Sequence, residues 1–519
     1  MACPGMIANW NCLCFEATRA RKLGILGQAG ASERMMKMKD AAGHLRPGAR
    51  AAAGVALTLA AIAALAQNPS SANNPFYGSV TVTRVTDDVL KLSLDDAVAR
   101  GLKNNLGLRE AEAGELELKG LKNQALQEFL PNVTLSGGTG VYEHNLAAQG
   151  FGPGTLAKFG SQFPNGLPPG LSFITKDDLT QVQFNLTQTL FSGPVIAGLK
   201  AARAAERVAY YQKMTARGEV VQQVATAYLR TLAAGSAVDN AQAELDADQV
   251  AYDHAHQQHE AGVAANLDEL RARVQLQAQQ QTLIAAKNER EKNLILLKRE
   301  IGIDPGQKVE LTDQTPYGEL AVQTPEEVRA IAYRSRQDYQ NLQNQVTELK
   351  ALHSAYRAQR LPTLKFHGYW GTDTVNGAGT HGNFAAVGTL SVPIFREASL
   401  RGDEDASAAQ LSSVRAQLND LTDRIDQQVR AAMLDVNAAQ KLVDVARSNV
   451  ELATQALADE TDRVQAGVDD NLPLVTAQAT LASAQSNLVD SLYQYNVAKL
   501  GLARAAGVLE TQYKVYLGN

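Results

Sequence analysis

The chain has 519 residues, of which 45% are hydrophobic, 20% are charged and only 6% are aromatic, and its formal net charge is −5. This mildly acidic balance gives no electrostatic reason to expect nucleic-acid binding. The three cysteines all lie within the first fourteen residues, which excludes a disulfide or a thiolate metal site in the rest of the chain. No apolar run reaches the ~18 residues expected of a membrane-spanning helix, which argues against a helical membrane protein.

Residues 1–66 have the pattern of an export leader that contains a signal peptide. Four basic residues precede an apolar stretch at 51–65, and Ala64-Leu65-Ala66 fits the small-x-small pattern of a cleavage site. We therefore expect cleavage after Ala66, and the alternative is a short buried helix. Because the leader holds eight Lys or Arg and three Asp or Glu residues, its removal leaves 41 basic and 51 acidic side chains, a net charge of −10.

The rest of the chain contains one unit twice. Residues 222–302 align without gaps to 427–507 at an offset of 205, and Leu130-Pro131 aligns to Leu361-Pro362 at an offset of 231. The surplus in the first repeat falls in the Gly/Pro-rich stretch 146–178, which is compatible with an extracellular plug or a disordered loop. An ordered series of such matches indicates an internal duplication.

Each repeat has the same order of predicted elements. A helix starts after Ser93 or Thr324, where a hydroxyl and early acidic residues suit a helix N-terminus, and it stops before a proline. Strand-like segments with a two-residue alternation follow, at 132–144, 179–191, 363–375 and 383–395. Two further helices complete each repeat, at 198–261 and 267–301 in the first and at 399–466 and 472–506 in the second.

These elements divide the chain into six predicted segments. They are the leader (1–66), an N-terminal extended segment (67–91), the first repeat (92–302, with its β-hairpin at 132–191), a linker (303–323), the second repeat (324–507, with its β-hairpin at 363–395) and a C-terminal tail (508–519).

The predicted helix lengths indicate the architecture. A helix of about 64 residues is about 96 Å long, and the two shorter helices of the same repeat match this length when they are placed end to end. Four alternating strands cannot close a barrel, whereas three chains would supply twelve strands. The predicted fold is therefore mainly α with a small β part: duplicated helical hairpins form a trimeric α-barrel, and four strands per chain complete a 12-stranded transmembrane β-barrel.

Several short motifs follow one another along the two repeats, and the last two of them occur in both repeats. They are Leu-Ser-Leu-Asp-Asp-Ala-Val at 92–98, Phe-Leu-Pro-Asn-Val at 129–133, Thr-Leu-Phe-Ser-Gly at 189–193, Val-Pro-Ile-Phe at 392–395, the Ala-Gly-Val turns at 261 and 466, and Leu-x4-Gly at 297–302 and 502–507. With this order the chain resembles the TolC-like outer-membrane efflux proteins over about residues 90–510.

The resemblance implies a function in transport and no enzymatic activity or cofactor. The expected protein is a homotrimeric duct in the outer membrane of a Gram-negative-type bacterium that extends into the periplasm and contacts outer-membrane lipid. It would carry substrates passed on by a periplasmic adaptor (a membrane fusion protein) and an inner-membrane pump, in a tripartite efflux or type I secretion system. The main alternative is a periplasmic coiled-coil scaffold or adhesin without a pore, and an enzyme is a distant third.

Two matched turns are the predicted contacts for the adaptor. The resemblance implies that hairpin tips of the adaptor bind at such turns, although a glycine that ends a helix explains each Gly on its own. The residues are Gly262, Val263, Asn266 and Leu267 in the first repeat and Gly467, Val468, Asn471 and Leu472 in the second.

Charged residues near these turns suggest a pore mouth. The family often has two aspartates at the start of the last helix, but here Pro473 and Thr476 occupy those positions. Acids that could instead form a cation-favouring ring, or simply suit helix N-termini, are Asp268, Glu269, Asp469 and Asp470. A metal site or a pH-sensitive latch is conceivable at His254, His256 and His259, but a solvated polar helix is the favoured interpretation.

Aromatic residues of the predicted strands suit the membrane-interface belts of outer-membrane barrels, and ordinary hairpin packing explains them nearly as well. They are Tyr142, Phe366, Tyr369, Trp370 and Phe384.

Overall fold

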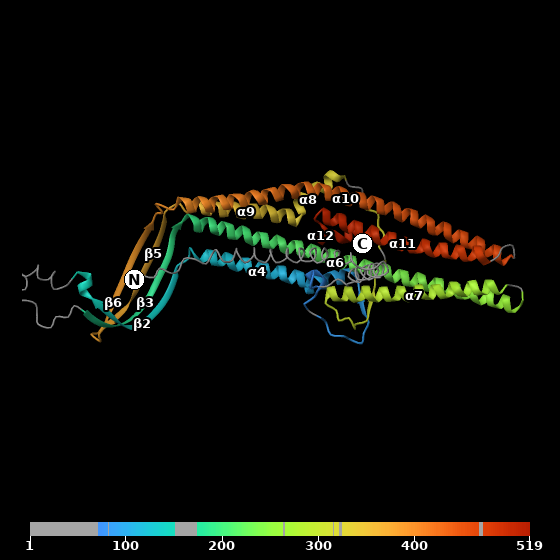
Figure 1. Ribbon diagram of the computed structural model, residues 1–519, viewed down its shortest axis with the longest axis horizontal. Coiled ribbons are helices and arrows are strands. Elements are labelled where there is room, and N and C mark those ends of the chain that lie inside the picture. Colours follow the sequence, from blue (N-terminus) through green and yellow to red (C-terminus); the bar gives the residue numbers. More distant parts are fainter. Residues whose placement is uncertain are drawn as a thin grey trace, which may run out of the picture. The chain divides into compact units, whose positions relative to one another are not determined.

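The computed structural model describes residues 71–518 apart from 81, 151–173, 263–264, 315, 321–323 and 467–470. The predicted leader and most of the surplus stretch 146–178 therefore lie outside the described residues. The described part of the chain is mainly helical, with one four-stranded sheet and one two-stranded sheet (Figure 1). Among these residues, no helix combines the length and the hydropathy needed to cross a membrane.

The first helix of each repeat is interrupted once. In the first repeat α3 (Leu94–Asn104) and α4 (Leu106–Gln127) meet at Asn105, whose side chain accepts a hydrogen bond from the Gly107 N–H at 3.0 Å. In the second repeat α8 (Pro325–Ser335) and α9 (Gln337–Ala358) meet at Arg336. The two breaks are 231 residues apart, which is the offset of the sequence match. We predicted a single helix in each case because neither position carries proline or glycine.

The four predicted strands form one antiparallel sheet in the order β2-β3-β5-β6. Their bounds are β2 Asn132–Asn145, β3 Ile174–Ser192, β5 Thr363–Val375 and β6 Thr380–Ser391, with a 3-10 turn at Leu146–Gln149. Strand β6 ends four residues earlier than predicted, and Pro393, which has no backbone N–H for a strand ladder, follows. Strands β2 and β6 are the two edges of the sheet within the described chain.

Each β-hairpin leads into a very long helix and then a shorter one. The pairs are α6 (Gly193–Glu260) with α7 (Asn266–Ile301), and α10 (Glu397–Gln465) with α11 (Asn471–Ala505). At 68 residues, α6 is about 100 Å long. It begins earlier than predicted because Ser192 caps the Val195 N–H at 3.4 Å and Pro194 suits the first turn of a helix.

The helices lie side by side in four tracks, each being one long helix or two shorter helices end to end (Figure 1). The order is α4 with α7, then α6, then α9 with α11, and finally α10. Continuous and composite tracks thus alternate, and the sheet lies at the opposite end of α6 and α10 from the turns that lead into α7 and α11.

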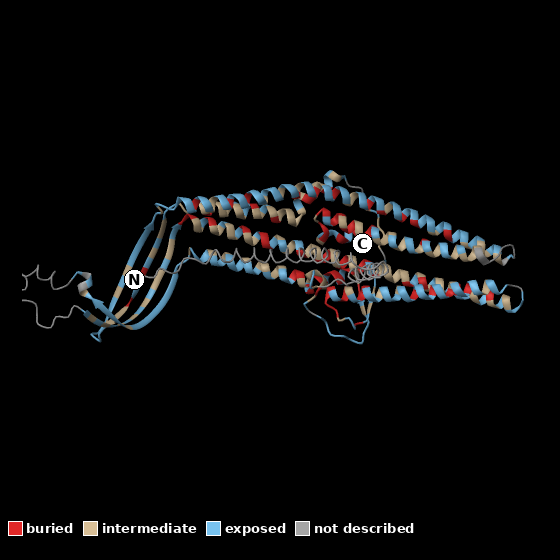
Figure 2. Ribbon diagram, in the orientation of Figure 1, coloured by how far each residue is buried: buried red, intermediate tan, exposed pale blue. Residues whose placement is uncertain are grey.

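The main hydrophobic core lies near the middle of the tracks (Figure 2). There β1 (Leu90–Leu92) pairs in parallel with β4 (Val309–Leu311), and the C-terminal helix α12 (Leu509–Leu517) packs against α11 and α6. A short 3-10 helix, Pro75–Tyr77, packs against α4. Tyr228 and Tyr495 are fully buried in this core, so the first and second repeats are joined by shared packing there.

Candidate functional site

The first hairpin turn lies where α6 meets α7. Gly262 has a φ of 74°, a left-handed conformation that favours glycine, and its N–H donates to the His259 carbonyl at 2.9 Å. Gly262 is therefore explained by helix termination alone. Leu267, in the first turn of α7, is 55% exposed and has no such local role, and Asn266 is also exposed.

Much of the second predicted turn cannot be compared with the first. The residues Val263, Gly467, Val468, Asp469 and Asp470 lie outside the described residues, and Asn471 and Leu472 are described only as the start of α11. Adaptor contact and a pore mouth at these positions stay predictions.

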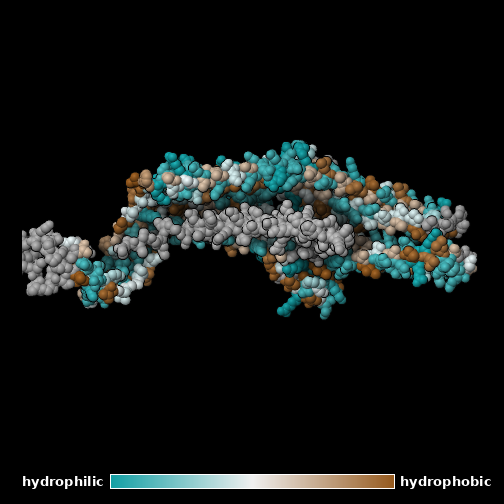
Figure 3. Space-filling model, viewed as in Figure 1, coloured by the Kyte–Doolittle hydropathy of each residue, from teal (hydrophilic) through white to brown (hydrophobic). Residues whose placement is uncertain are grey.

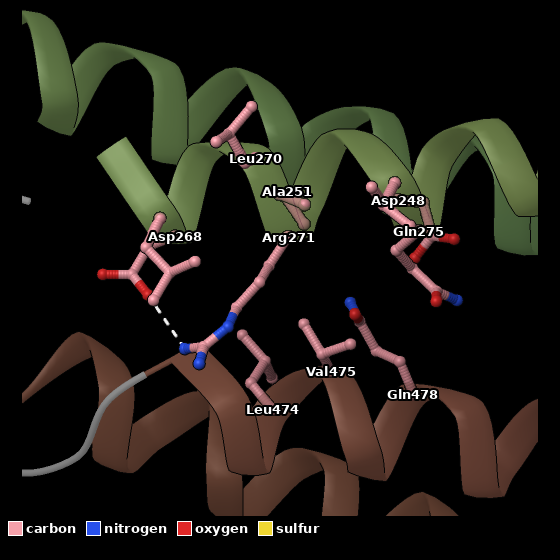
Figure 4. Close-up of a pocket in the computed structure, with 12 residues that line it drawn as sticks. Asp248, Ala251, Asp268, Leu270, Arg271, Gln275, Leu474, Val475 and Gln478 are labelled. Carbon is pink, nitrogen blue, oxygen red and sulfur yellow. Dashed lines mark hydrogen bonds and ion pairs between the residues drawn. The ribbon is translucent and has the colours of Figure 1, made fainter. Parts of the chain in front are cut away.

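A groove of about 410 Å³ lies between the helical hairpin α6–α7 and the helical hairpin α10–α11, near their turns (Figure 4). Its walls come from α6 and α7 on one side and from Leu474, Val475 and Gln478 of α11 on the other. Arg271 points from α7 toward α11 and pairs with Asp268, Nη1 to Oδ1, at 3.4 Å. Helical spacing gave no sign of Arg271 as a functional candidate, because its role depends on how the two hairpins pack.

The described acids of the predicted pore mouth are both paired with basic groups of their own hairpin. Asp268 pairs with Arg271, and Glu269 accepts a hydrogen bond from His256 Nδ1 at 2.9 Å. His259 Nε2 lies 3.8 Å from the second oxygen of Glu269, whereas His254 is exposed on another face of α6. His256, His259 and Glu269 therefore form one cluster, although the sequence suggested separate sites for the histidines and the acid.

The described residues give no support for metal chemistry at this cluster. No group of three or more His, Cys, Asp or Glu side chains in this part of the chain has an arrangement that could hold a metal ion. The cluster is instead a network of hydrogen bonds and ion pairs that links the end of α6 to the start of α7.

The four-stranded sheet has one apolar and one polar face. Leu135, Phe184, Trp370 and Phe384 are register partners across all four strands, and their side chains are 48–78% exposed. Phe184 and Trp370 stack with their ring centroids 6.4 Å apart. On the other face, the corresponding rows are Thr134–Asn185–Tyr369–Ala385 and Ser136–Gln183–Gly371–Asn383. The strict alternation of residues 182–187 already indicated this division.

The predicted aromatic set divides between these two faces. The apolar face includes Phe366 and Trp370, which lie an even number of residues apart along β5. It also includes Phe384, which is the register partner of Trp370 on β6. Tyr369 and Tyr142 fall on the polar face, and Tyr142 stacks there with His144. Phe184 joins the apolar face although it was not among the predicted aromatics.

An exposed apolar segment connects the sheet to the last long helix. Ile394 and Phe395, between β6 and α10, are 95% and 97% exposed. Figure 3 shows hydrophobic surface in this region, where the sheet meets the helices. Side chains of this size rarely remain uncovered in a functional assembly.

Comparison with known proteins agrees with this architecture. The family model "Outer membrane efflux protein" matches residues 98–302 and 329–508. The outer membrane protein TolC of Escherichia coli K12 is 22% identical over 360 residues, covering 66% of this chain and 72% of TolC.

Two solved structures share the fold. A membrane protein from Pseudomonas aeruginosa superposes with a TM-score of 0.68 at 19% identity, covering 80% of this chain and 93% of that chain. The CmeC outer membrane channel of Campylobacter jejuni superposes with a TM-score of 0.66 at 15% identity, covering 85% and 94%. Because the family model matches well over half of the chain, this protein belongs to the outer membrane efflux protein family and is located in the outer membrane, extending into the periplasm.

Proposed function

We propose that the protein is one protomer of a homotrimeric duct of a tripartite efflux or type I secretion system. Three chains would close a 12-stranded transmembrane β-barrel and continue it as an α-helical barrel through the periplasm. The duct passively conducts substrates that an inner-membrane pump and a periplasmic adaptor deliver to the exterior. It performs no catalysis and uses no cofactor.

The observation that carries this proposal is the apolar row across the sheet. Leu135, Phe184, Trp370 and Phe384 would face water in a periplasmic scaffold, whereas in a barrel they face lipid and the polar rows face the lumen. Within the described residues, β2 and β6 each have one edge without a strand partner. This supports the same conclusion, because edge strands within a membrane need partners for their backbone hydrogen bonds.

Channel recording separates this duct from a scaffold without a pore. The detergent-extracted protein should give discrete conductance steps in planar bilayers. Phe384→Arg should reduce membrane insertion strongly, because an arginine on the lipid-facing side of a barrel costs about 2–4 kcal/mol at the bilayer midplane. Asn185→Arg, on the polar face, is the matched control and should insert normally. A protein that is released by carbonate washing and never conducts would contradict the proposal.

Adaptor contact is tested best at Leu267. Substituting Gly262 would strain the backbone whatever the partner, because its φ is positive. A photo-crosslinking residue at the exposed Leu267 should instead capture the periplasmic adaptor in cells, while the same residue at the exposed Val515 of α12 should not. Equal capture at both positions, or none at 267, would contradict docking at this end.

A further inference from the structure

His256 has a carboxylate oxygen beside each of its two ring nitrogens. Its Nδ1 lies 2.9 Å from Glu269 Oε1, and its Nε2 lies 3.5 Å from Glu260 Oε1. A neutral imidazole carries only one N–H, so one of its nitrogens would present a lone pair to a carboxylate. Only the imidazolium form can donate toward both acids. The geometry alone therefore favours the charged form of His256.

Glu269 connects two turns of α6 to the start of α7. One of its oxygens accepts from His256, and the other lies 3.8 Å from His259 Nε2. The Glu269 side chain is only 17% exposed, and the Tyr252 ring stacks on His256 with centroids 5.9 Å apart. We call His256, His259, Glu260 and Glu269 the clasp, because they join the two helices beside their turn.

The charges around the clasp are predominantly negative. On α6, Asp253 adds a third carboxylate to the field at His256, and on α7 Asp268 is already paired with Arg271. On the neighbouring α11, the first ionisable residue is Asp490, nineteen positions into the helix. The hydrogen bond to Glu269 and the nearby carboxylates raise the pKa of His256 above its ordinary value of about 6.5, although desolvation opposes them.

The second repeat has no counterpart of the clasp. At the offset of 205, His256, His259, Glu260 and Glu269 correspond to Thr461, Val464, Gln465 and Leu474, none of which is ionisable. Leu474 instead forms part of the apolar wall of the groove between the hairpins. The end of the first helical hairpin can therefore respond to pH, and the end of the second is an internal reference for the same measurement.

We propose that the clasp is a proton-controlled device that orders the end of the first hairpin in mildly acidic conditions and loosens it as the pH rises. Docking of the adaptor at this end would then be strongest when the clasp is protonated. The ordering of the hairpin stands on the geometry above, whereas its effect on docking rests on the proposed function.

The sign of the effect follows from the raised pKa. A histidine whose pKa is raised by folding contributes stability that is complete below about pH 6.5 and is lost as the pH rises through the higher pKa of the folded state. The first hairpin end should therefore open more often in neutral to alkaline conditions, whereas the second should not respond.

Hydrogen exchange of the assembled, detergent-solubilised protein tests the device. Amide protection around residues 252–262 and 265–271, corrected for intrinsic exchange, is compared with that around 457–466 and 471–476 between pH 5.5 and 8.5. EDTA is present throughout to remove stray metal ions. We expect the amide protection of the first hairpin end, divided by that of the second, to fall about threefold or more as the pH rises from 5.5 to 8.5.

Two variants decide the outcome. Glu269→Gln keeps the shape but removes the charge, so the ratio at pH 5.5 should fall to the wild-type value at pH 8.5 and stay flat. His254→Gln alters the exposed histidine outside the clasp and should behave as the wild type. A flat ratio in the wild type, or an unchanged pH response in Glu269→Gln, overturns the proposal.

Photo-crosslinking from position 267 at the same pH values tests the docking step separately. Capture of the adaptor should decrease with rising pH in the wild type and lose this dependence in Glu269→Gln. If the exchange ratio responds to pH but no adaptor is captured at any pH, the proposed docking site is wrong and the clasp stands. If capture is strong but insensitive to pH, the regulatory role is wrong and docking stands.

Discussion

The residues that lead into the two long helices are equivalent in sequence but differ in their surroundings. In the first repeat, Phe191 is 44% exposed and lines a groove together with Ala358 and Leu361 at the end of α9. Packing there is so close that a Cβ on Gly193 would lie 3.0 Å from the Ala358 Cβ. In the second repeat, the equivalent Phe395 is 97% exposed, because none of the described helices lies on that side of α10.

In the proposed homotrimer, this difference indicates where the neighbouring protomer would bind. The end of α4 is the duplicate of the end of α9, since Gln127 and Leu130 correspond to Ala358 and Leu361. It forms the opposite border of the four tracks from α10 (Figure 1). The contact that Phe191 makes within one chain can therefore recur for Phe395 only between two chains.

The largest expected effect comes from making this junction polar. Ile394→Asp combined with Phe395→Asp should abolish assembly, because burying each apolar side chain contributes about 1.5–3 kcal/mol and an assembled ring would have to bury the new charges. The isolated chain should fold normally, since both positions are exposed in it. Native mass spectrometry would measure assembly and circular dichroism the helix content.

Val515→Asp, at an exposed apolar position of α12, is the control for that experiment. It should assemble as the wild type does. An oligomer that survives the double substitution would show that Phe395 is not buried between two chains as Phe191 packs within one.

A cysteine pair tests the distance between the start of α10 in one chain and the end of α4 in the next. The duplicates of the close pair Gly193 and Ala358 are Glu397 and Gln127, and the chain has no cysteine after residue 14. Glu397→Cys with Gln127→Cys should therefore crosslink most chains into a ladder that ends at three on non-reducing gels, because the Cβ atoms would meet at disulfide distance. Neither single variant should give the trimer band. Only intramolecular products would contradict the arrangement.

The duplication, the four strands and the long helices could be predicted because they depend on local patterns. Alternation places Phe184 and Trp370 on one face, and proline marks the end of the first helices. The breaks escaped prediction because neither position carries a helix-breaking residue. Asn105 caps α4 with its side chain, whereas the Arg336 guanidinium makes no cap and instead contacts Asp338 and Gln428. Likewise, His256 meets Glu269 only because the turn brings together residues thirteen positions apart.

A buried acid distinguishes the two repeats within the core. Glu300 is 3% exposed, accepts one hydrogen bond from Gln223 at 3.1 Å and corresponds to Ala505 in the second repeat. Burial raises the pKa of Glu300 to about 8, above its ordinary value near 4.5. The folded protein therefore keeps a proton that the unfolded chain loses, and wild-type stability should fall as the pH rises from about 4.5 to 8.

Replacing this acid should remove that pH dependence. Glu300→Gln should match the wild type near pH 4.5 and exceed its free energy of unfolding by about 4 kcal/mol at pH 8. Urea unfolding at several pH values measures the difference. Glu260→Gln is not a suitable control because it belongs to the clasp, whereas Glu110→Gln changes an exposed acid of α4 and should leave the profile unchanged. Equal slopes for Glu300→Gln and wild type would show that Glu300 is ionised in the assembly.

The smallest expected effect concerns Lys499, a buried cation of the second repeat at a position where the first repeat has an apolar residue. Lys499 is fully buried, donates to the carbonyls of Gly318 and Leu517 at 3.2 and 3.4 Å, and corresponds to the buried Leu294. Burial lowers the pKa of Lys499 to about 8 from its ordinary value of 10.5. The unfolded chain thus holds a proton that the folded protein releases, so stability should rise with pH between about 8 and 10.5. Lys499→Leu, which reproduces the first repeat, should lack this rise, so that its free energy of unfolding falls behind that of the wild type by about 1 kcal/mol between pH 8 and 9.5.

The Lys499 side chain also links α12 and the linker to α11, so the substitution should weaken the amide protection of residues 509–517 in hydrogen exchange. If the two proteins have parallel stability profiles, the charge of Lys499 does not change on folding, and the difference between the repeats at this position is one of shape alone.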